Sequence, residues 1–198
     1  MNQKREDTKA YIVKNVAPIF NRKGYTGTSL SDITTATGLS KGSVYGNFKN
    51  KPDLAVKAFY FNVDKLISPM IAIASSEKNS IKSIRALTKY YRDYYIQSLA
   101  SGGCPILNVG VDAKYNNPEL FKAAQEVSQK IVRKLTIIII KGIRKKEIKK
   151  KIDADLYARN IYSMIEGGVF MASVHEDNNY LLNILDQVDI IIKKKLKA

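Results

Sequence analysis

The sequence contains one cysteine, one histidine and no tryptophan among its 198 residues. A single cysteine, Cys104, cannot form a disulfide within the chain. This lack of disulfide-forming cysteines favours a reducing, cytoplasmic compartment. One histidine and one cysteine cannot supply the ligands of a His/Cys metal cluster. No apolar stretch follows the basic N-terminus, so we predict no secretion signal. The composition therefore predicts a cytoplasmic protein without an internal disulfide or a metal site.

The residues that enzymes need are scarce as well. Nothing in the sequence combines a nucleophile, a base and an orienting acid, and there is no glycine loop of the phosphate-binding type. The scattered carboxylates are those expected of any helical protein. We therefore expect neither catalytic activity nor a cofactor, and substrate turnover by the purified chain would contradict this expectation.

Long hydrophobic runs and acidic residues are both rare. The strongly apolar run from Leu135 to Ile140 is far shorter than the roughly 20 residues of a membrane-spanning helix, so we expect it in a core helix. Lys and Arg number 33 against 18 Asp and Glu, a formal net charge of +15. This excess indicates a polyanionic partner, either nucleic acid or an anionic membrane surface, and charge alone does not choose between them.

The stretch from Thr28 to Phe48 is patterned as a helix-turn-helix. Thr28 or Ser29 is suited to cap a first helix, Gly38 to make the turn, and Ser40 to cap a second helix. The apolar residues are spaced so that they share one face of the pair: Leu30, Ile33, Ala36, Leu39, Val44 and Phe48. In a helix-turn-helix the second helix enters the major groove of DNA, so the pattern predicts a nucleic-acid partner.

The segment from Ile12 to Leu54 closely resembles the tetracycline-repressor-like (TetR/AcrR) transcription regulators. The matching residues are Phe20, Gly24-Tyr25, Thr28-Ser29-Leu30, Asp32-Ile33, Ala36, Gly38 to Tyr45, Phe48, Lys51 and Leu54. Gly46 and Asn47 depart from the pattern, because the family usually has an aromatic or His after the recognition-helix Tyr and a His before Phe48. The resemblance implies an all-α chain with a three-helix DNA-binding domain at residues 1–51. Residues 52–198 would then form a helical effector-binding and dimerisation domain.

Candidate DNA contacts lie in and around the second helix: Ser29, Lys41, Gly42, Ser43, Tyr45, Asn47 and Lys51. Gly42 and Ser43 are small, so the backbone can approach bases and phosphates closely, and Lys41 can reach guanine acceptors or a phosphate. Tyr45 offers a hydroxyl to phosphate. Ser29 is either a phosphate contact or only a helix cap, and the two roles are compatible. Asn47 could read adenine. By the resemblance, Lys51 meets the DNA backbone of the same half-site.

The first helix is predicted to span about Glu6 to Lys23, with Pro18 kinking it and Gly24 ending it. Its basic residues are placed near the DNA backbone by the resemblance, although a solvated basic face explains them equally well: Lys4, Arg5, Lys9 and Lys14. A connecting helix is predicted from Asp53 to about Ala74, with Pro69 bending or ending it early.

The remaining chain is predicted to be helical and to hold an effector. A helix at about 81–99 carries four tyrosines, which form either a core or interface stripe or part of a ligand site. The candidate effector-binding residues, for an apolar or aromatic small molecule, are Tyr91, Tyr95, Cys104, Phe121 and Phe170. Cys104 is alternatively a small buried apolar residue or a redox sensor. Helices at about 153–174 and 179–196 are the last two long ones, and the resemblance implies that they pair two protomers.

Two lysine clusters have no place in this scheme. They are Lys141, Arg144, Lys145, Lys146, Lys149, Lys150 and Lys151, and then Lys193, Lys194, Lys195 and Lys197. Each is either a further patch for nucleic acid or membrane, or a solvated basic surface.

The resulting expectation is a homodimeric repressor that binds a (pseudo)palindromic double-stranded operator and is released by a small effector. It would have no membrane partner. The alternatives are an activator of the same type and a protein that coats DNA without sequence preference.

Overall fold

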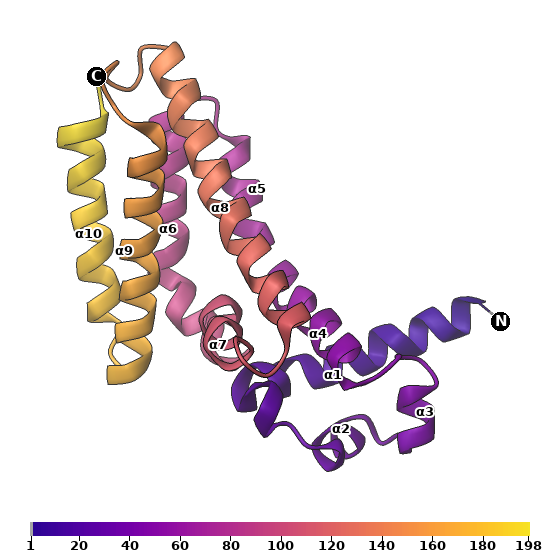
Figure 1. Ribbon diagram of the computed structural model, residues 1–198. Helices are drawn as coiled ribbons and strands as arrows, with labels where there is room; N and C mark the ends of the chain where they lie inside the picture. Colours follow the sequence, from indigo (N-terminus) through magenta and orange to yellow (C-terminus); the bar gives the residue numbers. More distant parts are fainter. Residues whose placement is uncertain (1) are drawn as a thin grey trace. The chain divides into compact units, whose positions relative to one another are not determined.

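The computed structural model describes residues 2–198, with side chains from Arg5 onward. Within these residues every named element is helical, and the only extended pairing is an isolated bridge between Ile148 and Lys197. The all-α prediction is therefore confirmed. The elements are α1 (Asn2–Gly27), α2 (Leu30–Thr37), α3 (Lys41–Tyr45), α4 (Lys51–Leu66), α5 (Ser68–Ser76), α6 (Ser80–Leu99), α7 (Pro105–Asp112), α8 (Pro118–Arg144), α9 (Ala154–His175), α10 (Asn179–Ile191) and a π-helical segment, η1 (Ile192–Leu196) (Figure 1).

The chain forms two compact units, each built from two stretches of sequence. The first unit contains Met1–Lys65 and Ser98–Glu126, and the second contains Leu66–Gln97 and Val127–Ala198. The predicted boundary between residues 51 and 52 stays a prediction, because units defined by packing do not say which part of the chain folds alone.

The core of the first unit forms along α1. Ile12, Val16 and Ala17 are fully buried, as their helical spacing predicts. Backbone geometry leaves the helical region at Gly24, where φ is 74° and ψ is 171°, and resumes for one more turn to Gly27. The break lies at the predicted Gly24, whereas Pro18 lies inside the helix and is not where the backbone leaves helical geometry.

The glycine turn before α7 packs directly on α1. The side-chain amide of Asn21 donates to the carbonyls of Ser101 at 2.7 Å and Gly103 at 2.8 Å. The amide of Asn108 returns from α7 to the carbonyls of Asn21 and Gly102. Buried backbone carbonyls need such partners, so the two asparagines hold the turn against α1.

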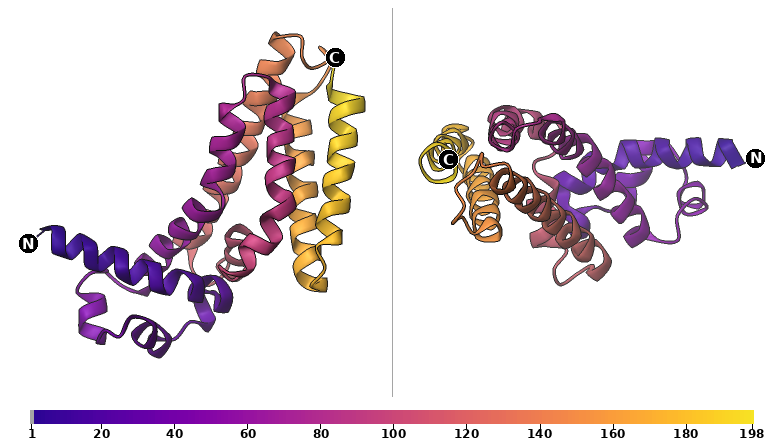
Figure 2. Two further views of the ribbon diagram at one scale, coloured as in Figure 1. Left: turned by 180° about the vertical axis from the view of Figure 1, so that it is seen from behind. Right: turned by 90° about the horizontal axis from the view of Figure 1, so that it is seen from above.

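The second unit contains α5, most of α6, the longer part of α8, and α9 with α10 and η1 (Figure 2). As Pro69 predicts, the connecting helix ends early, at Leu66, and α5 begins again with Pro69 in its first turn. Arg92 of α6 pairs with Asp186 at 2.6 Å and with Asp189 at 3.1 Å, and so connects α6 to α10. α9 and α10 pack closely at Gly168, where a Cβ would lie only 3.1 Å from the Leu181 side chain.

Candidate nucleic-acid interface

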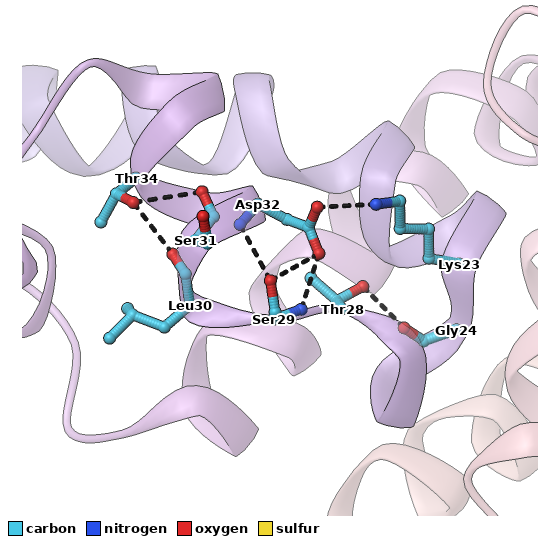
Figure 3. A network of polar contacts seen from close by, with 8 residues as sticks. All are labelled: Lys23, Gly24, Thr28, Ser29, Leu30, Ser31, Asp32 and Thr34. Carbon is cyan, nitrogen blue, oxygen red and sulfur yellow. Dashed lines mark hydrogen bonds and ion pairs between the residues drawn. The ribbon is translucent and has the colours of Figure 1, made fainter.

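A network of polar contacts fixes the start of α2. Ser29 is the N-cap, and its hydroxyl oxygen accepts from the N–H of Asp32 at 3.1 Å while the Asp32 carboxylate accepts from the N–H of Ser29 at 2.8 Å (Figure 3). This reciprocal pair is a capping box, which satisfies two backbone donors that the helix itself leaves unpaired. Lys23 of α1 approaches the other Asp32 oxygen at 2.6 Å. The predicted cap is confirmed at Ser29, while Thr28 is buried and donates to the carbonyl of Gly24.

The Ser29 hydroxyl is already occupied in this network. It donates to the Asp32 carboxylate at 2.8 Å in addition to accepting from the Asp32 N–H. A phosphate could therefore receive the Ser29 hydroxyl hydrogen only by displacing that carboxylate oxygen. The first N–H groups of α2 have no acceptor within the helix, and they provide the alternative route to a phosphate at this end. The DNA contact predicted for Ser29 stays a prediction.

The same contacts set the charge of Asp32. The hydrogen bond from Lys23, and then those from the backbone and hydroxyl of Ser29, lower the pKa of Asp32 from 3.8 to about 2. A carboxyl with a lowered folded-state pKa stabilises the fold above its unfolded-state pKa, and that contribution is lost as pH falls towards the folded-state pKa. We predict that wild-type protein is more stable than Asp32→Asn by a constant amount above pH ~5, and that the gap shrinks between pH 3.8 and about 2.

Urea unfolding of both proteins across this pH range measures the gap. Glu77→Gln is the matched control, because Glu77 is an exposed carboxylate for which the described chain contains no ion pair within 4.0 Å. A gap between wild type and Asp32→Asn that stays constant down to pH 2 would show that Lys23 and Ser29 do not bind the charged form preferentially.

The short helix α3 is capped at its N-terminus and anchored by buried apolar side chains. The hydroxyl of Ser40 accepts from the N–H of Ser43 at 3.2 Å, which confirms Ser40 as its cap. Val44 is fully buried and Phe48, just beyond the helix, is 3% exposed. Lys41, Gly42 and Ser43 are exposed. Three of the predicted DNA contacts therefore share the solvent-facing side of one helix turn.

No close contact within the first unit requires glycine at position 42. A Cβ built there has Ser40 Oγ as its nearest neighbour, at 3.9 Å, which is an ordinary van der Waals distance. The residue lies inside a helix, where glycine is less favourable than alanine by about 1 kcal/mol. Gly38 differs, because its φ of 66° ends α2 in the left-handed conformation that favours glycine. The free space at Gly42 therefore lies outside the protein, where a closely approaching partner would use it.

Two further side chains tie the end of α3 into the domain. The Asn47 amide donates one N–H to the carbonyl of Ser43 at 2.8 Å, which leaves its second N–H and its oxygen for other partners, so the adenine contact predicted for Asn47 stays a prediction. Arg5 of α1 donates to the carbonyl of Gly46 at 3.1 Å. Arg5 therefore has a structural role besides the predicted proximity to DNA, and the side chain of Lys4 lies outside the described residues.

Lys51 lies against the ring of Tyr25. Its Nζ is 4.4 Å from the centre of the Tyr25 ring, and burial lowers the pKa of Lys51 while the Asp112 carboxylate opposes that shift. Burial, and next the nearby Tyr25, raise the pKa of Tyr45, so its hydroxyl stays protonated as a hydrogen-bond donor. Asp112 also accepts from the N–H of Tyr25 just after the Gly24 break. Lys51 and Tyr45 are thus positioned on one side of the first unit by α1 and α7.

Sequence reasoning identified the exposed residues of this surface but not the side chains that support it. Asp112 bonds Tyr25 from 87 positions away, and Lys23 meets Asp32 across the turn between two helices. Neither pair has a local spacing pattern that would have revealed it. Only the Gly24-Tyr25 motif indicated a close contact here. A glycine is required at position 24 because a Cβ would come within 3.0 Å of the Asp112 carboxylate.

The predicted effector residues are spread over both units. Tyr91 and Tyr95 are buried in α6, as is Tyr94, whose ring lies 5.0 Å from that of Tyr91, whereas Tyr90 is half-buried. Cys104 is buried at the start of α7, as expected of a small apolar residue. Phe121 is half-buried on α8, and Phe170 is 51% exposed on α9. The effector-binding role of all five residues stays a prediction.

An open cavity of about 480 Å³ lies beside α5 and α6 in the second unit. Of the four tyrosines only Tyr90 is among its lining residues, with Ile73, Arg85 and Lys89. Among the described residues, no helix combines the length and apolarity needed to cross a membrane, and no three His, Cys, Asp or Glu side chains are grouped as a metal site would require.

Two family models cover this architecture. Residues 17–58 match the model described as "Bacterial regulatory proteins, tetR family", and residues 80–188 match "Tetracyclin repressor-like, C-terminal domain". The chain belongs to the tetracycline-repressor-like (TetR) family. A TetR transcriptional regulator from Chloroflexus aurantiacus J-10-FL shares 30% identity with it and a TM-score of 0.92, each chain being covered to 98%.

Two other similar proteins are named for their function. The HTH-type transcriptional repressor DhaR from Mycobacterium sp. (strain GP1) is 23% identical over 187 residues, which are 93% of this chain and 91% of that protein. The TetR family regulator CifR, solved as a cysteine mutant with a 26-base-pair operator duplex, shares the fold at a TM-score of 0.80 and 16% identity, over 94% of this chain and 95% of that one.

The chain is thus a TetR-family transcriptional regulator, a class of operator-binding proteins that are not enzymes. Every predicted DNA contact, from Ser29 to Lys51, falls inside the first family match. The lysines from 193 to 197 lie beyond the second one.

Proposed function

We propose that this TetR-family regulator is a cytoplasmic repressor that binds a (pseudo)palindromic operator as a homodimer and is released by a small apolar or aromatic effector. The observation that carries the proposal is the exposed turn of α3. Lys41, Gly42 and Ser43 face solvent on a helix anchored by the buried Val44, and Gly42 leaves space that the fold itself does not use. A helix presented in this way fits the major groove.

Each candidate contact then has a separate role. Lys41 supplies a cation to guanine acceptors or a phosphate, and Gly42 with Ser43 lets the backbone come close. Tyr45 and Lys51 lie together against Tyr25 and supply a hydroxyl and a cation to the phosphates of the half-site. The first N–H groups of α2, behind the Ser29 cap, would hold a further phosphate.

Homodimerisation is supported by the last two long helices. α9 and α10 leave large apolar side chains exposed that the described chain does not cover: Leu156, Phe170, Met171, Val174, Tyr180 and Ile190. Exposed apolar groups of this size favour burial against a second copy, as in a four-helix dimer interface. Two-fold symmetry would then place two recognition helices about 34 to 36 Å apart, one turn of DNA, or a multiple of that spacing.

Release by an effector follows from linkage. The two DNA-binding units of a dimer can be spaced to fit the operator or spaced wrongly. An effector that binds the wrongly spaced conformation more tightly lowers operator affinity, at most by the ratio of its affinities for the two conformations. The name of the related DhaR supports the repressor role over that of an activator.

Selection of bound fragments from the source genome tests the proposal. We expect purified protein to recover fragments that share a two-fold repeat, and to sediment as a dimer of the 22.2 kDa chain at micromolar concentration. Lys41→Ala is expected to weaken binding and to relax sequence preference by roughly 1 to 3 kcal/mol at one base pair, whereas Tyr45→Phe should weaken all sequences alike. Recovery of random fragments would instead support a DNA-coating protein, and equal losses on operator and random DNA would remove base reading from Lys41.

A further inference from the structure

Two lysine-rich segments that are far apart in the sequence lie side by side at one end of the second unit. Seven basic residues occur from Lys141 to Lys151, and four occur from Lys193 to Lys197. The N–H of Lys149 donates to the carbonyl of Leu196 at 2.9 Å, and the N–H of Ala198 donates to the carbonyl of Glu147 at 3.1 Å. The fold therefore joins both clusters into one surface. We call these eleven basic side chains the basic patch.

The backbone under the basic patch is ordered by packing. Ile148 is 1% exposed and Leu196 is fully buried, so each segment is anchored by an apolar side chain next to its lysines. Gly142 is needed for this packing, since a Cβ there would come within 2.6 Å of the Ile148 side chain. The Nζ of Lys149 donates to the carbonyl of Lys194 at 2.8 Å. The lysines are thus carried on a built surface and not on a loose tail.

Little of the charge of the basic patch is paired with carboxylates among the described residues, although Lys145 lies near enough to Glu147 to lower the pKa of that carboxyl after its hydrogen bond from the Ser80 backbone. Glu147 is the only acidic residue in the two segments, and its carboxylate accepts from the N–H of Ser80 at 2.7 Å, at the start of α6. Across residues 5–198, no side chain of the basic patch forms an ion pair within 4.0 Å. Gathering like charges in this way is unfavourable for folding, so the arrangement favours an anionic partner.

The chemistry of the basic patch fits DNA better than a membrane. All but one of its cations are lysines, which act as point charges on phosphates, and Arg144 is the only side chain with a planar fork. An amphipathic membrane-surface helix places an apolar face in the lipid, but within the two segments Ile148 and Leu196 are buried and Ile143 is half-buried, so they present no such face. The charged side chains are carried by two segments that are hydrogen-bonded to each other, so they form a fixed surface that can meet the phosphates of a stiff duplex.

We propose that the basic patch binds the phosphate backbone of a DNA duplex without reading its sequence, as a second DNA contact that is separate from α3. A protein held on an operator by its helix-turn-helix could then also hold another stretch of duplex through its second unit. This contact goes beyond operator recognition, because it requires neither the recognition helix nor an effector.

Charge-neutralised variants test the basic patch in the full-length protein. The patch variant replaces Lys150, Lys151, Lys194 and Lys195 by Gln, four exposed side chains that form no ion pair within 4.0 Å among the described residues. The control variant carries the same charge change on α6 and α8: Lys89, Lys122, Lys130 and Lys134 replaced by Gln. A rescue variant places Arg at the four patch positions, and circular dichroism with thermal unfolding checks that every variant is folded.

The first measurement is affinity for a random-sequence duplex of about two helical turns as a function of salt concentration. Each phosphate contact contributes about 0.9 to the slope of log affinity against log salt, so the patch variant should lose up to about 3.6 in slope per protomer. The control should lose much less, and the Arg rescue should restore the slope. An unchanged slope in the patch variant, or an equal loss in the control, would overturn the proposal.

The second measurement asks whether one protein holds two duplexes. Protein is loaded on an immobilised operator fragment, and capture of a labelled random duplex is recorded. We expect capture by wild type and the control, and at least about tenfold less by the patch variant, with operator retention unchanged. Capture that is equal for the patch variant would contradict the proposal.

Two further outcomes separate the alternatives. Failure of every protein to stay on the operator would contradict the proposed operator binding, whereas the salt slopes would still decide the basic patch. The wild type could also bind phosphatidylglycerol vesicles. If the patch variant lost that binding while its slope of log DNA affinity against log salt stayed unchanged, the surface would be assigned to a membrane and the proposal overturned.

Discussion

Replacing Gly42 by leucine is expected to weaken operator binding by about 10- to 100-fold and to leave the free protein folded. In the free chain the new side chain starts in open space, because the nearest atom to its Cβ is Ser40 Oγ at 3.9 Å. Leucine is also the better helix former, so the free energy of unfolding should stay constant or rise by up to about 1 kcal/mol. In the complex the same side chain would occupy the space between α3 and the bases. Overpacking of this kind costs roughly 1 to 3 kcal/mol, and each 1.4 kcal/mol is a factor of ten in Kd.

Titration of a labelled operator with wild-type and Gly42→Leu protein measures the effect, with urea unfolding alongside. Gly110→Leu is the matched control, since Gly110 lies on α7 and a Cβ there has nothing within 4 Å. It should be as stable as the first variant and bind DNA normally. Full operator affinity in Gly42→Leu would mean that this turn of α3 does not face the duplex, and the proposed recognition surface would be wrong.

Gly102→Ala is expected to destabilise the protein by about 2 to 5 kcal/mol. Gly102 has a φ of 84°, in the left-handed region, which costs other residues about 1 to 2 kcal/mol. A Cβ there would also lie 2.9 Å from the backbone N of Arg22 on α1, and backbone cannot move aside as a flexible side chain does. Overpacking adds roughly 1 to 3 kcal/mol.

Gly38→Ala separates the two contributions. Gly38 has a similar φ of 66°, but nothing lies within 4 Å of a Cβ there, so only the cost of about 1 to 2 kcal/mol for the backbone conformation is expected. Urea unfolding of the three proteins at one protein concentration gives both differences, since the stability of the proposed dimer would depend on concentration. Equal losses in the two variants would show that the turn before α7 is not tightly packed on α1.

Much of the DNA-binding module could be predicted because its signals are local. Ser29 and Ser40 as caps, Gly38 as a turn and Gly24 as a break each depend on bonds or angles within a few residues. The all-α class and the Pro69 break follow from equally short patterns. Resemblance added the family and the candidate DNA contacts.

The support beneath these contacts could not be predicted in the same way. Lys23 meets Asp32, and Asp112 meets Tyr25, only because the chain folds back on itself. Asn47 shows the same limit at short range, because the sequence alone does not tell that its amide donates to the carbonyl of Ser43. Single side chains with several possible partners are decided by what lies nearby in three dimensions.

The sequence by itself determined where helices begin and end, which faces are apolar, and that the chain carries a large excess of positive charge. Only the tertiary structure decided where that charge gathers, and it brought the lysines after Lys141 to those after Lys193 through a backbone bridge between Ile148 and Lys197. It also buried Tyr91 in the core and left Gly42 beside open space. Helix signals act over one or two turns and can be read along the chain, whereas burial and the meeting of charges depend on contacts between distant segments, which no local pattern records.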